Sequence, residues 1–414
     1  MVPNGWENTR LKNIAKIKSG STPLRAKQDL YYSKDGTPWI KTLDLNNSDI
    51  LTTDEKITDL ALQETSCSVF PINTVLVAMY GGFNQIGRTG LITVPSAINQ
   101  ALSGLVLNEE KAHPRYVLNY LNGNVKQWKK FAASSRKDPN ITREDVCSFE
   151  ILLPPLPEQR KIAKILSTWD KAISATERLI DNSKQQKKAL MQQLLTGKKR
   201  LLDDKGKPFE GEWETAILSD IGKVSIGLVT TMTKYYVDDG IPLIRNSDIK
   251  PNTINKTKML QLCSDFSSDY DNRKLRKGDI VTVHTGEVGV SSVIDDELDW
   301  CIGFATLNTR PNISKVNSQY LSWYFNSERF INWCVSMSTG DGRQNLNLKD
   351  FIKAKVLLPS LEEQHKIVSV LKNADQEIEL LEHQLADLKQ EKKALMQQLL
   401  TGKRRVKVED EVAA

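Results

Sequence analysis

A fourteen-residue segment occurs twice in the chain, as KKALMQQLLTGKKR at 187–200 and as KKALMQQLLTGKRR at 392–405. The copies are identical at 13 of 14 positions and differ only where Lys199 is replaced by Arg404. They lie 205 residues apart in a chain of 414, so each repeat would fill half of the protein. Self-similarity at a constant offset indicates a tandem duplication, and any fold of this chain has to accommodate it.

The duplication continues towards the N-terminus at the same offset. LLPPLPEQRKIAKIL from Leu152 aligns without a gap with LLPSLEEQHKIVSVL from Leu357, and TPWIKTLDL from Thr37 matches IPLIRNSDI from Ile241 more weakly. At the front, GWENTRLKNIAKIKSG resembles EWETAILSDIGKVSIG. The predicted order is domain, helix, domain, helix. Its boundaries are a first domain at 1–153, a first long helix at 154–200, a linker at 201–211, a second domain at 212–358, a second long helix at 359–405 and an acidic tail at 406–414.

The two halves diverge unevenly, because the helical segments are nearly identical while the domains share only scattered framework positions. One explanation is that a regular helix tolerates fewer changes than a loop-rich domain. The other is that both helices serve one shared architecture while each domain recognises something different.

Both helical regions carry apolar residues at alternating spacings of four and three, which is typical of the seam of a coiled coil. Prolines at 154, 155 and 157 predict a helix start near Glu158, and Gly197 and Gly402 predict the C-terminal ends. About 40 residues would make a rod roughly 60 Å long. The main seam positions are Ile162, Leu166, Trp169, Ile173, Leu190 and Leu194 in the first helix and Ile367, Leu371, Ile378, Leu385, Leu395 and Leu399 in the second.

Each seam needs a partner, and the other helix of the same chain is the first candidate. The first helical segment is strongly basic, whereas the body of the second is acidic, which favours pairing between them. Pairing between molecules is the alternative. The expected fold class is α+β, with two mixed α/β domains separated by two long helices. We expect antiparallel pairing, which would place the domains at opposite ends of a spacer, but the residues alone do not exclude a parallel pair.

The domains read as short strands, turns and one long helix each. TVLVAMYGG from Thr74, LSGLVLN from Leu102 and DIVTVHTG from Asp279 are strand candidates. PRYVLNYLNGNVKQWKKF from Pro114 and QYLSWYFNSERFINWC from Gln319 are helix candidates. The segments lack the regular alternation of strand and helix found in a Rossmann sheet.

Polar and basic loops follow the central strand and the helix of each domain. Their side chains are of the types that hydrogen-bond base edges and phosphates, and their glycines allow close approach to a ligand. Solvated turns are the alternative for any single residue. Equivalent loops with different sequences in both domains favour recognition. The candidate contacts, which include Arg245 in the aligned segment IPLIRNSDI, are Tyr80, Asn84, Gln85, Arg88, Arg136, Lys137, Arg245, His284, Thr285, Arg343, Gln344 and Asn345.

Several classes of protein are disfavoured. No apolar run reaches the ~18–20 residues of a membrane span, and the start has no apolar signal region, so we expect a cytoplasmic protein without a membrane partner. The five cysteines are dispersed and predict neither a disulfide framework nor a zinc ribbon. We find no phosphate-binding loop, no HExxH and no acidic metal cluster with credible spacing, so neither catalytic nor metal-binding residues are predicted. The net charge of +6 permits a nucleic acid partner without requiring one.

These features together resemble a known family. A duplicated chain with two unlike domains, two near-identical long helices and the segment LPPLPEQRKI before the first helix is similar to the specificity (S) subunit of type I restriction-modification systems. The resemblance covers essentially the full length. Leu361 and Glu362 depart from the proline-rich spacing at the second helix, and the acidic tail has no family role that we can name.

The resemblance implies that each domain is a target recognition domain that reads one half of a bipartite site in double-stranded DNA. The helices would set the spacing and dock two modification (M) subunits, and restriction (R) subunits would join the full complex. This chain would be non-catalytic and hold no cofactor, with S-adenosylmethionine, ATP and Mg expected on the partner subunits. The rival hypotheses are a scaffold whose two domains bind proteins, and a nuclease or methyltransferase in its own right.

Overall fold

The computed structural model describes residues 2–132, 139–340 and 342–408 and divides the chain into two compact units. Unit 1 comprises 1–177 and 383–414, and unit 2 comprises 178–382. Each unit combines an α/β domain with part of both long helices, α7 (Leu156–Leu194) and α13 (Leu361–Leu399). No described helix has an apolar stretch that could cross a membrane.

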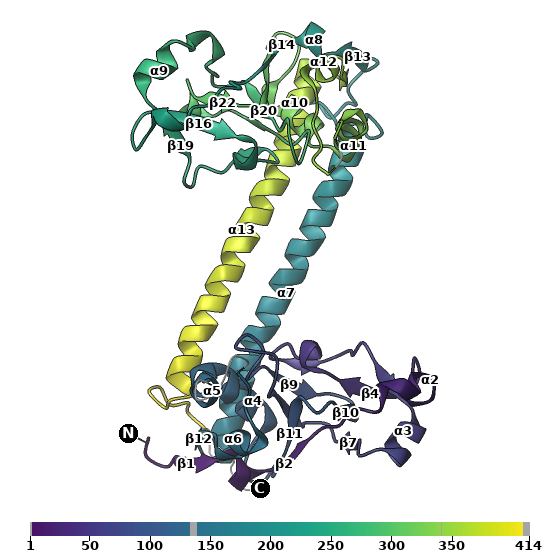
Figure 1. Cartoon of the computed structure of the whole chain (residues 1–414), viewed down its shortest axis with the longest axis vertical. Coiled ribbons are helices and arrows are strands. Elements are labelled where there is room, and N and C mark those ends of the chain that lie inside the picture. The colour runs from purple at the N-terminus through teal and green to yellow at the C-terminus, as the bar shows by residue number, and fades with distance from the viewer. Residues whose placement is uncertain (1, 133–138, 341, 409–414) are drawn as a thin grey trace. The chain divides into compact units, whose positions relative to one another are not determined.

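The domain of unit 1 contains β1 (Glu7–Arg10), α1 (Leu11–Ile14), β2 (Ala15–Ser19), α2 (Gln28–Tyr31), β3 (Tyr32–Ser33), β4 (Thr37–Ile40), β5 (Asp49–Ile50), β6 (Lys56–Ile57), α3 (Asp59–Glu64), β7 (Val69–Phe70), β8 (Val75–Ala78), β9 (Thr89–Ile92), β10 (Ser96–Ile98), β11 (Leu102–Leu107), α4 (Pro114–Gly123), α5 (Val125–Ala132), α6 (Arg143–Ser148) and β12 (Glu150–Leu153). Its described strands form the sheets β1-β12, β3-β6-β4-β10-β7 and β2-β11-β8-β9-β5. Strand β8 is buried along its whole length. In Figure 1, α4, α5 and α6 lie on one side of the domain, and α2 and α3 lie on the other.

The domain of unit 2 contains β13 (Glu214–Ile217), α8 (Leu218–Ile221), β14 (Gly222–Ile226), β15 (Tyr236–Val237), β16 (Ile241–Arg245), β17 (Ile249–Lys250), β18 (Thr253–Ile254), β19 (Leu260–Leu262), α9 (Ser264–Ser268), β20 (Ile280–Thr282), β21 (Ser291–Val293), β22 (Ile302–Phe304), β23 (Leu307–Pro311), α10 (Ser318–Phe325), α11 (Glu328–Met337), α12 (Leu348–Phe351) and β24 (Lys355–Leu358). Its described sheets are β13-β24, β14-β23-β20-β21, β15-β19-β16-β22 and β17-β18. Both units therefore have the mixed α/β architecture that the sequence predicts.

The single helix predicted in each domain is wrong in one respect, because each is two helices. In unit 1, α4 ends at Gly123, and Asn124 leaves the helical conformation before α5 begins. In unit 2, the hydroxyl of Ser327 accepts from the backbone N–H of Phe330 and starts α11 as a new helix. Apolar spacing alone does not reveal such an interruption, because the apolar pattern continues across it.

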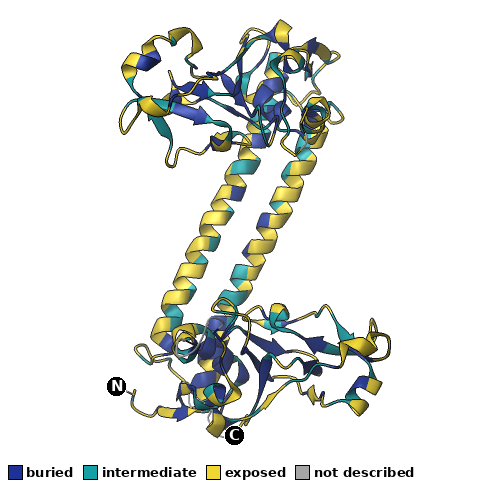
Figure 2. Ribbon diagram, viewed as in Figure 1, coloured by how far each residue is buried: buried dark blue, intermediate teal, exposed yellow. Residues whose placement is uncertain are grey.

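The predicted seam residues of both long helices are buried or half-buried, while most other positions of these helices are exposed (Figure 2). The residues at the ends of the seam also pack into the domains. Ile162 and Leu399 belong to the main hydrophobic core of unit 1, and Leu194 and Ile367 belong to that of unit 2. Each helix end is therefore anchored in a domain.

Ion pairs within each unit show that the helices are antiparallel. In unit 1, Lys392 pairs with Asp170, and Lys389 Nζ lies 2.8 Å from the carboxylate of Glu177. From the first pair to the second, the residue number falls on α13 and rises on α7, so the two helices run in opposite directions. In unit 2, Lys187 pairs with Asp375, and Lys184 pairs with Glu382 at 2.6 Å. These are the same two pairs displaced by 205 residues, so the duplication repeats the pairing as well as the sequence.

Glycine ends both helices as predicted. Gly197 and Gly402 have φ angles of 71° and 68°, in the left-handed region that favours glycine. Two residues later the chain bonds back to the helix, with Lys199 N donating to Gln193 O at 3.2 Å and Arg404 N donating to Gln398 O at 3.1 Å. The basic end of each repeated segment is therefore held in a defined turn.

A buried glutamate stands in the first turn of α7. In unit 1 the carboxylate of Glu158 accepts from Trp6 Nε1 at 3.0 Å and from Arg405 Nε and Nη2 at 2.7 and 2.8 Å. Its side chain is 4% exposed. We call this group of three a carboxylate clasp, because it joins the start of the domain to the start of one helix and the end of the other.

Unit 2 repeats the clasp. Glu363 accepts from Trp213 Nε1 at 3.2 Å and from Arg200 Nε and Nη2 at 2.7 and 2.8 Å. Its side chain is 1% exposed. A carboxylate buried this deeply is stable only if it is paired, and two bonds from one guanidinium are a strong arrangement.

The glutamine that follows each of these glutamates fastens a different segment. Gln159 is fully buried, accepts from His113 N at 2.8 Å and donates to Lys111 O and Pro154 O at 2.9 and 2.8 Å. Gln364 makes the matching bonds in unit 2. The Glu-Gln pair at the start of each long helix therefore has a structural role in both units.

We predict that Glu363→Gln lowers the free energy of unfolding by about 2 kcal/mol, because the amide no longer balances the charge of Arg200. Urea denaturation measures this. The matched control is Glu362→Gln, which changes an exposed neighbour and should cost less than about 0.5 kcal/mol. Equal effects of the two changes would contradict the clasp.

Candidate nucleic-acid interface

In unit 1, four of the predicted contacts lie on the loop between β8 and β9. Tyr80 and Asn84 are exposed, whereas Gln85 and Arg88 are partly buried. Arg88 Nη1 donates to Gln85 Oε1 at 2.8 Å, and the buried Ile86 anchors the loop. The loop is therefore braced from within and presents Tyr80 and Asn84 to solvent.

The other two predicted contacts of unit 1, Arg136 and Lys137, lie outside the described residues. After this stretch, Ile141 N donates to Met79 O at 3.0 Å, which places the start of the following segment beside the β8–β9 loop. Ile141 itself is fully buried. The β8–β9 loop is therefore tied to a described segment that follows the second predicted loop in sequence.

In unit 2, hydrogen bonds gather three of the predicted residues. His284 Nδ1 lies 2.8 Å from Thr285 Oγ1, and Thr285 Oγ1 donates to Asn345 Oδ1 at 2.6 Å. The backbone of His284 is held on both sides, because its N–H donates to Asn246 Oδ1 at 2.8 Å and its carbonyl accepts from Leu346 N at 2.9 Å. Asn246 is a member of this cluster that sequence reasoning missed.

Arg343 and Gln344 lie next to this cluster. Gly286 N donates to the carbonyl of Gln344 at 3.0 Å, which ties the loop after α11 to the loop after β20. Arg343 is exposed and Gln344 is partly buried. The structure therefore brings together the two predicted loops of unit 2.

Arg245 is held by a carboxylate. Its Nε and Nη2 bond Asp248 at 3.0 and 2.9 Å, and this hydrogen bonding raises the pKa of Arg245. The backbone N–H of Arg245 also donates to Asp248, at 2.9 Å. Both hydrogens of Nη1 and the second hydrogen of Nη2 make no bond to Asp248, so a DNA contact by Arg245 would be made through these donors.

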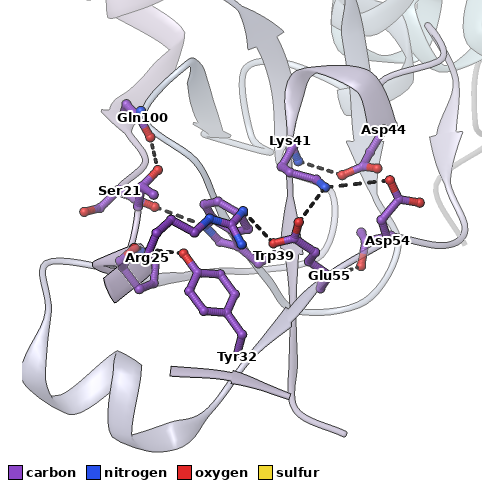
Figure 3. Close-up of polar contacts among 12 residues, drawn as sticks. Ser21, Arg25, Tyr32, Trp39, Lys41, Asp44, Asp54, Glu55 and Gln100 are labelled. Carbon is purple, nitrogen blue, oxygen red and sulfur yellow. Dashed lines mark hydrogen bonds and ion pairs between the residues drawn. The ribbon is translucent and has the colours of Figure 1, made fainter. Parts of the chain in front are cut away.

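Lys41 is the counterpart of Arg245 in unit 1, and the alignment of TPWIKTLDL with IPLIRNSDI was the signal that could have found it. Figure 3 shows Lys41 Nζ between Glu55, at 3.0 Å, and Asp54, at 3.7 Å. Its backbone N–H donates to Asp44 at 2.7 Å. The unit 1 cation is thus shared among carboxylates.

Arg25 braces the same region (Figure 3). Its guanidinium lies 4.3 Å from the centre of the Tyr32 ring and bonds Glu55 at 2.7 Å. Burial works against the charged form of Glu55, but hydrogen bonds from Lys41 and Arg25 outweigh it and hold the pKa of Glu55 below its ordinary value. Trp39 Nε1, in the same region, donates to the Ser21 carbonyl at 3.0 Å.

Two apolar side chains near the predicted contacts were also missed. Leu43, beside Lys41, is 74% exposed, and Phe83, on the β8–β9 loop, is 51% exposed. Apolar side chains contact the methyl group of thymine in protein–DNA complexes. Neither residue belongs to the polar types from which the prediction was made.

The side chains of these loops are of types that form hydrogen bonds with ligands. Among the described residues, no three His, Cys, Asp or Glu side chains gather as a metal site. Burial lowers the pKa of His284, which favours its neutral form. The loops offer amides, hydroxyls, a neutral imidazole and guanidinium groups, which together can donate to and accept from base edges and donate to phosphates.

A separate hollow of about 1230 Å³ lies in unit 2, between α7, α13 and the start of α11. Lys184, Lys188, Lys198 and Arg329 line it, along with the carboxylate of Glu328. Lys188 Nζ lies 3.3 Å from that carboxylate. The hollow is mainly basic, and its α7 wall includes much of the repeated segment.

Comparison with known proteins identifies the family of the chain. The model of the "Type I restriction modification DNA specificity domain" matches residues 3–183 and again residues 210–390. The chain is 28% identical to the putative type I restriction enzyme MjaX specificity subunit of Methanocaldococcus jannaschii, over 98% of this chain and 95% of that protein. It is 25% identical to the type I restriction enzyme EcoBI specificity subunit of Escherichia coli, over 89% and 78%.

A solved structure supports the fold. The type I restriction-modification S subunit from M. genitalium is 16% identical, with a TM-score of 0.57 over 97% of this chain and 98% of that chain. At this identity the likeness concerns the fold alone. The two matches to the family model occupy most of the sequence, one in each half, and confirm the resemblance drawn from the repeats. The chain therefore belongs to the family of type I restriction-modification DNA specificity subunits, with one recognition domain in each half.

Proposed function

We propose that the domain of each unit reads one half of a bipartite site in double-stranded DNA through the loops described above. The observation that carries the proposal is a shared framework with unlike loops. Met79 and Tyr80 in unit 1 occupy the places of His284 and Thr285 in unit 2, and the backbone bond from Ile141 to Met79 matches the bond from Leu346 to His284.

Two kinds of contact with DNA are expected, one to phosphates and one to bases. Lys and Arg side chains neutralise phosphates and hold the register, whereas amide, hydroxyl and imidazole groups read base edges at about 1–3 kcal/mol for each good bidentate contact. The braced loops in both units lose little freedom on binding, because internal hydrogen bonds already hold them. We expect the exposed Arg343 to contribute mainly to phosphate contact.

Methylome sequencing of cells with and without an intact copy of this chain should test the proposal. We predict that loss of the chain removes one bipartite adenine-methylation motif. The duplicated framework predicts that replacing residues 212–358 alone changes one half of the motif and leaves the other. A motif that changes in both halves would contradict the proposal that each domain reads one half of the site.

The helices supply the spacing in this proposal. Because each helix ends in the core of a domain, a change of helix length cannot be absorbed by a flexible joint. The recognition domains would then meet DNA at a separation that depends on helix length.

We predict that inserting one heptad after Ile180 and another after Leu385, the equivalent position of the second repeat, lengthens the gap in the motif by about three base pairs. Seven residues add roughly 10 Å to a helix and keep the seam in register. The control is the same heptad inserted in the linker at 201–211, which should leave the gap unchanged. An unchanged gap in the helix variant, read from the methylome, would refute the spacer role.

The repeated segments would dock two M subunits, one in each unit. Packing explains why Leu194 and Gly197 are the same in both repeats, but it does not explain why exposed positions are also the same. Lys188 and Lys393 are equivalent and exposed. A shared partner surface accounts for that identity, and its basic character suits an acidic partner surface.

We predict that Lys188→Glu and Lys393→Glu each remove one of two bound M subunits and that the double change removes both. Charge reversal places a like charge against the acidic partner surface. Native mass spectrometry of the reconstituted complex measures the stoichiometry. Lys372→Glu changes an exposed lysine of α13 outside the repeated fourteen-residue segment, and this variant should still bind two M subunits. Full binding by the double variant would show that the repeats are not the docking surface.

The chemistry of modification and cleavage would belong to the partners. We infer that S-adenosylmethionine, ATP and Mg are held by the M and R subunits and that this non-catalytic chain contributes DNA recognition. A complex that acts on chromosomal and invading DNA would work in the cytoplasm.

A further inference from the structure

His284 is held in the unit 2 loops through both its backbone and its ring. Its backbone N–H is held by Asn246 and its carbonyl by Leu346, so the main chain is fixed from two other segments. Asn246 is itself anchored, since its Nδ2 donates to the carbonyl of Ala305 at 3.0 Å. The imidazole is then oriented by the contact of Nδ1 with Thr285 at 2.8 Å.

The direction of the hydrogen bonds decides which ring nitrogen carries the proton. Thr285 has one hydroxyl hydrogen, and it is donated to Asn345 Oδ1 at 2.6 Å. Towards His284 the hydroxyl oxygen can therefore only accept. Nδ1 must then be the N–H of the ring, and in the neutral imidazole Nε2 is left as an acceptor.

Nε2 is available to a ligand. No described residue bonds it, and it is not among the described buried polar atoms that lack a partner. An acceptor cannot bind a phosphate oxygen, which is itself an acceptor. In the major groove of DNA the donors are the N6 amino group of adenine and the N4 amino group of cytosine.

We propose that His284 Nε2 accepts a hydrogen bond from the exocyclic amino group of an adenine or cytosine in the half-site read by unit 2, with Thr285 and Asn345 as positioning residues that hold the tautomer. The inference rests on the function proposed above, because it presumes that this loop meets DNA. It adds the chemical class of the group that is recognised.

The surroundings keep the imidazole neutral. Burial lowers the pKa of His284. Four charged groups lie on the described segments around His284. Arg245 and Asp248 pair with each other, Glu287 is on the same loop as His284, and Arg343 is on the loop after α11. Protonation would convert Nε2 from an acceptor into a donor, so recognition of the amino group would be lost as pH falls through the pKa of His284.

Unit 1 has no histidine at the position that corresponds to His284. Met79 stands in the place of His284, is 3% exposed and accepts from the hydroxyl of Ser103 at its sulfur. Tyr80 stands in the place of Thr285. The inferred contact is therefore confined to one half-site, which provides an internal control.

The test uses this chain in complex with its M partner and duplexes that carry the motif found by methylome sequencing. Each adenine is replaced in turn by purine nucleoside, and each cytosine by 2-pyrimidinone nucleoside, so that one amino group is removed at a time. For the wild-type complex, fluorescence anisotropy should show about tenfold weaker binding at one position, in one half-site only. For His284→Ala and His284→Met, removal of that amino group should change affinity less than about twofold.

The positioning role has its own readout. Thr285→Val should abolish the sensitivity to that amino group, whereas Thr285→Ser, which keeps the hydroxyl, should retain it. Both variants should discriminate bases of the other half-site as the wild type does, which shows that they are folded. In the wild-type complex the sensitivity should also disappear at low pH.

Two failures are distinguishable. If the wild-type complex prefers the motif over a scrambled duplex but His284→Ala keeps full sensitivity at every amino group, the role of His284 is wrong and DNA reading stands. If the wild-type complex shows no preference for the motif, both the inference and the proposed function are overturned.

Discussion

The fold of each unit depends on a buried carboxylate at the start of a long helix. Glu158 and Glu363 each bind an indole N–H from the beginning of their own domain and a guanidinium from the end of the opposite helix. Burial removes water as an alternative partner, so the carboxylate is stable only when all three segments are in place. The same interaction therefore closes the domain, sets the position of both helix ends and orients the basic turn at the end of each repeated segment.

This arrangement separates framework from recognition. The clasps, the buried glutamines and the antiparallel ion pairs recur in both units, because every one of them links parts of the framework to each other. The loops after β8 and β20 carry no such constraint at their tips. They are held at their bases by backbone hydrogen bonds, and their side chains differ between the units, as the exposed Tyr80 and the half-buried Thr285 do.

Much of the architecture was predictable because its signals are local. The seam follows from the spacing of apolar residues, and the helix ends follow from Gly197 and Gly402, whose positive φ angles the structure confirms. The interruptions at Asn124 and Ser327 were missed, since apolar spacing continues across them. At the candidate interface, the loops were predicted from residue type, but Asn246, Lys41 and Phe83 were not. Asn246 and Lys41 meet their partners only in the folded structure, and Phe83 is not one of the polar types from which the loops were predicted.

The sequence by itself determined the duplication, the two long helices, the α/β character of the domains and the family resemblance, because repeats and periodic patterns are properties of residue order. The tertiary structure decided the direction of helix pairing, the partner of each buried carboxylate and the hydrogen-bond chain from His284 to Asn345. These depend on groups as far apart as Glu158 and Arg405, separated by 247 positions. Only folding brings such groups within hydrogen-bond distance, and local sequence patterns carry no record of which groups will meet.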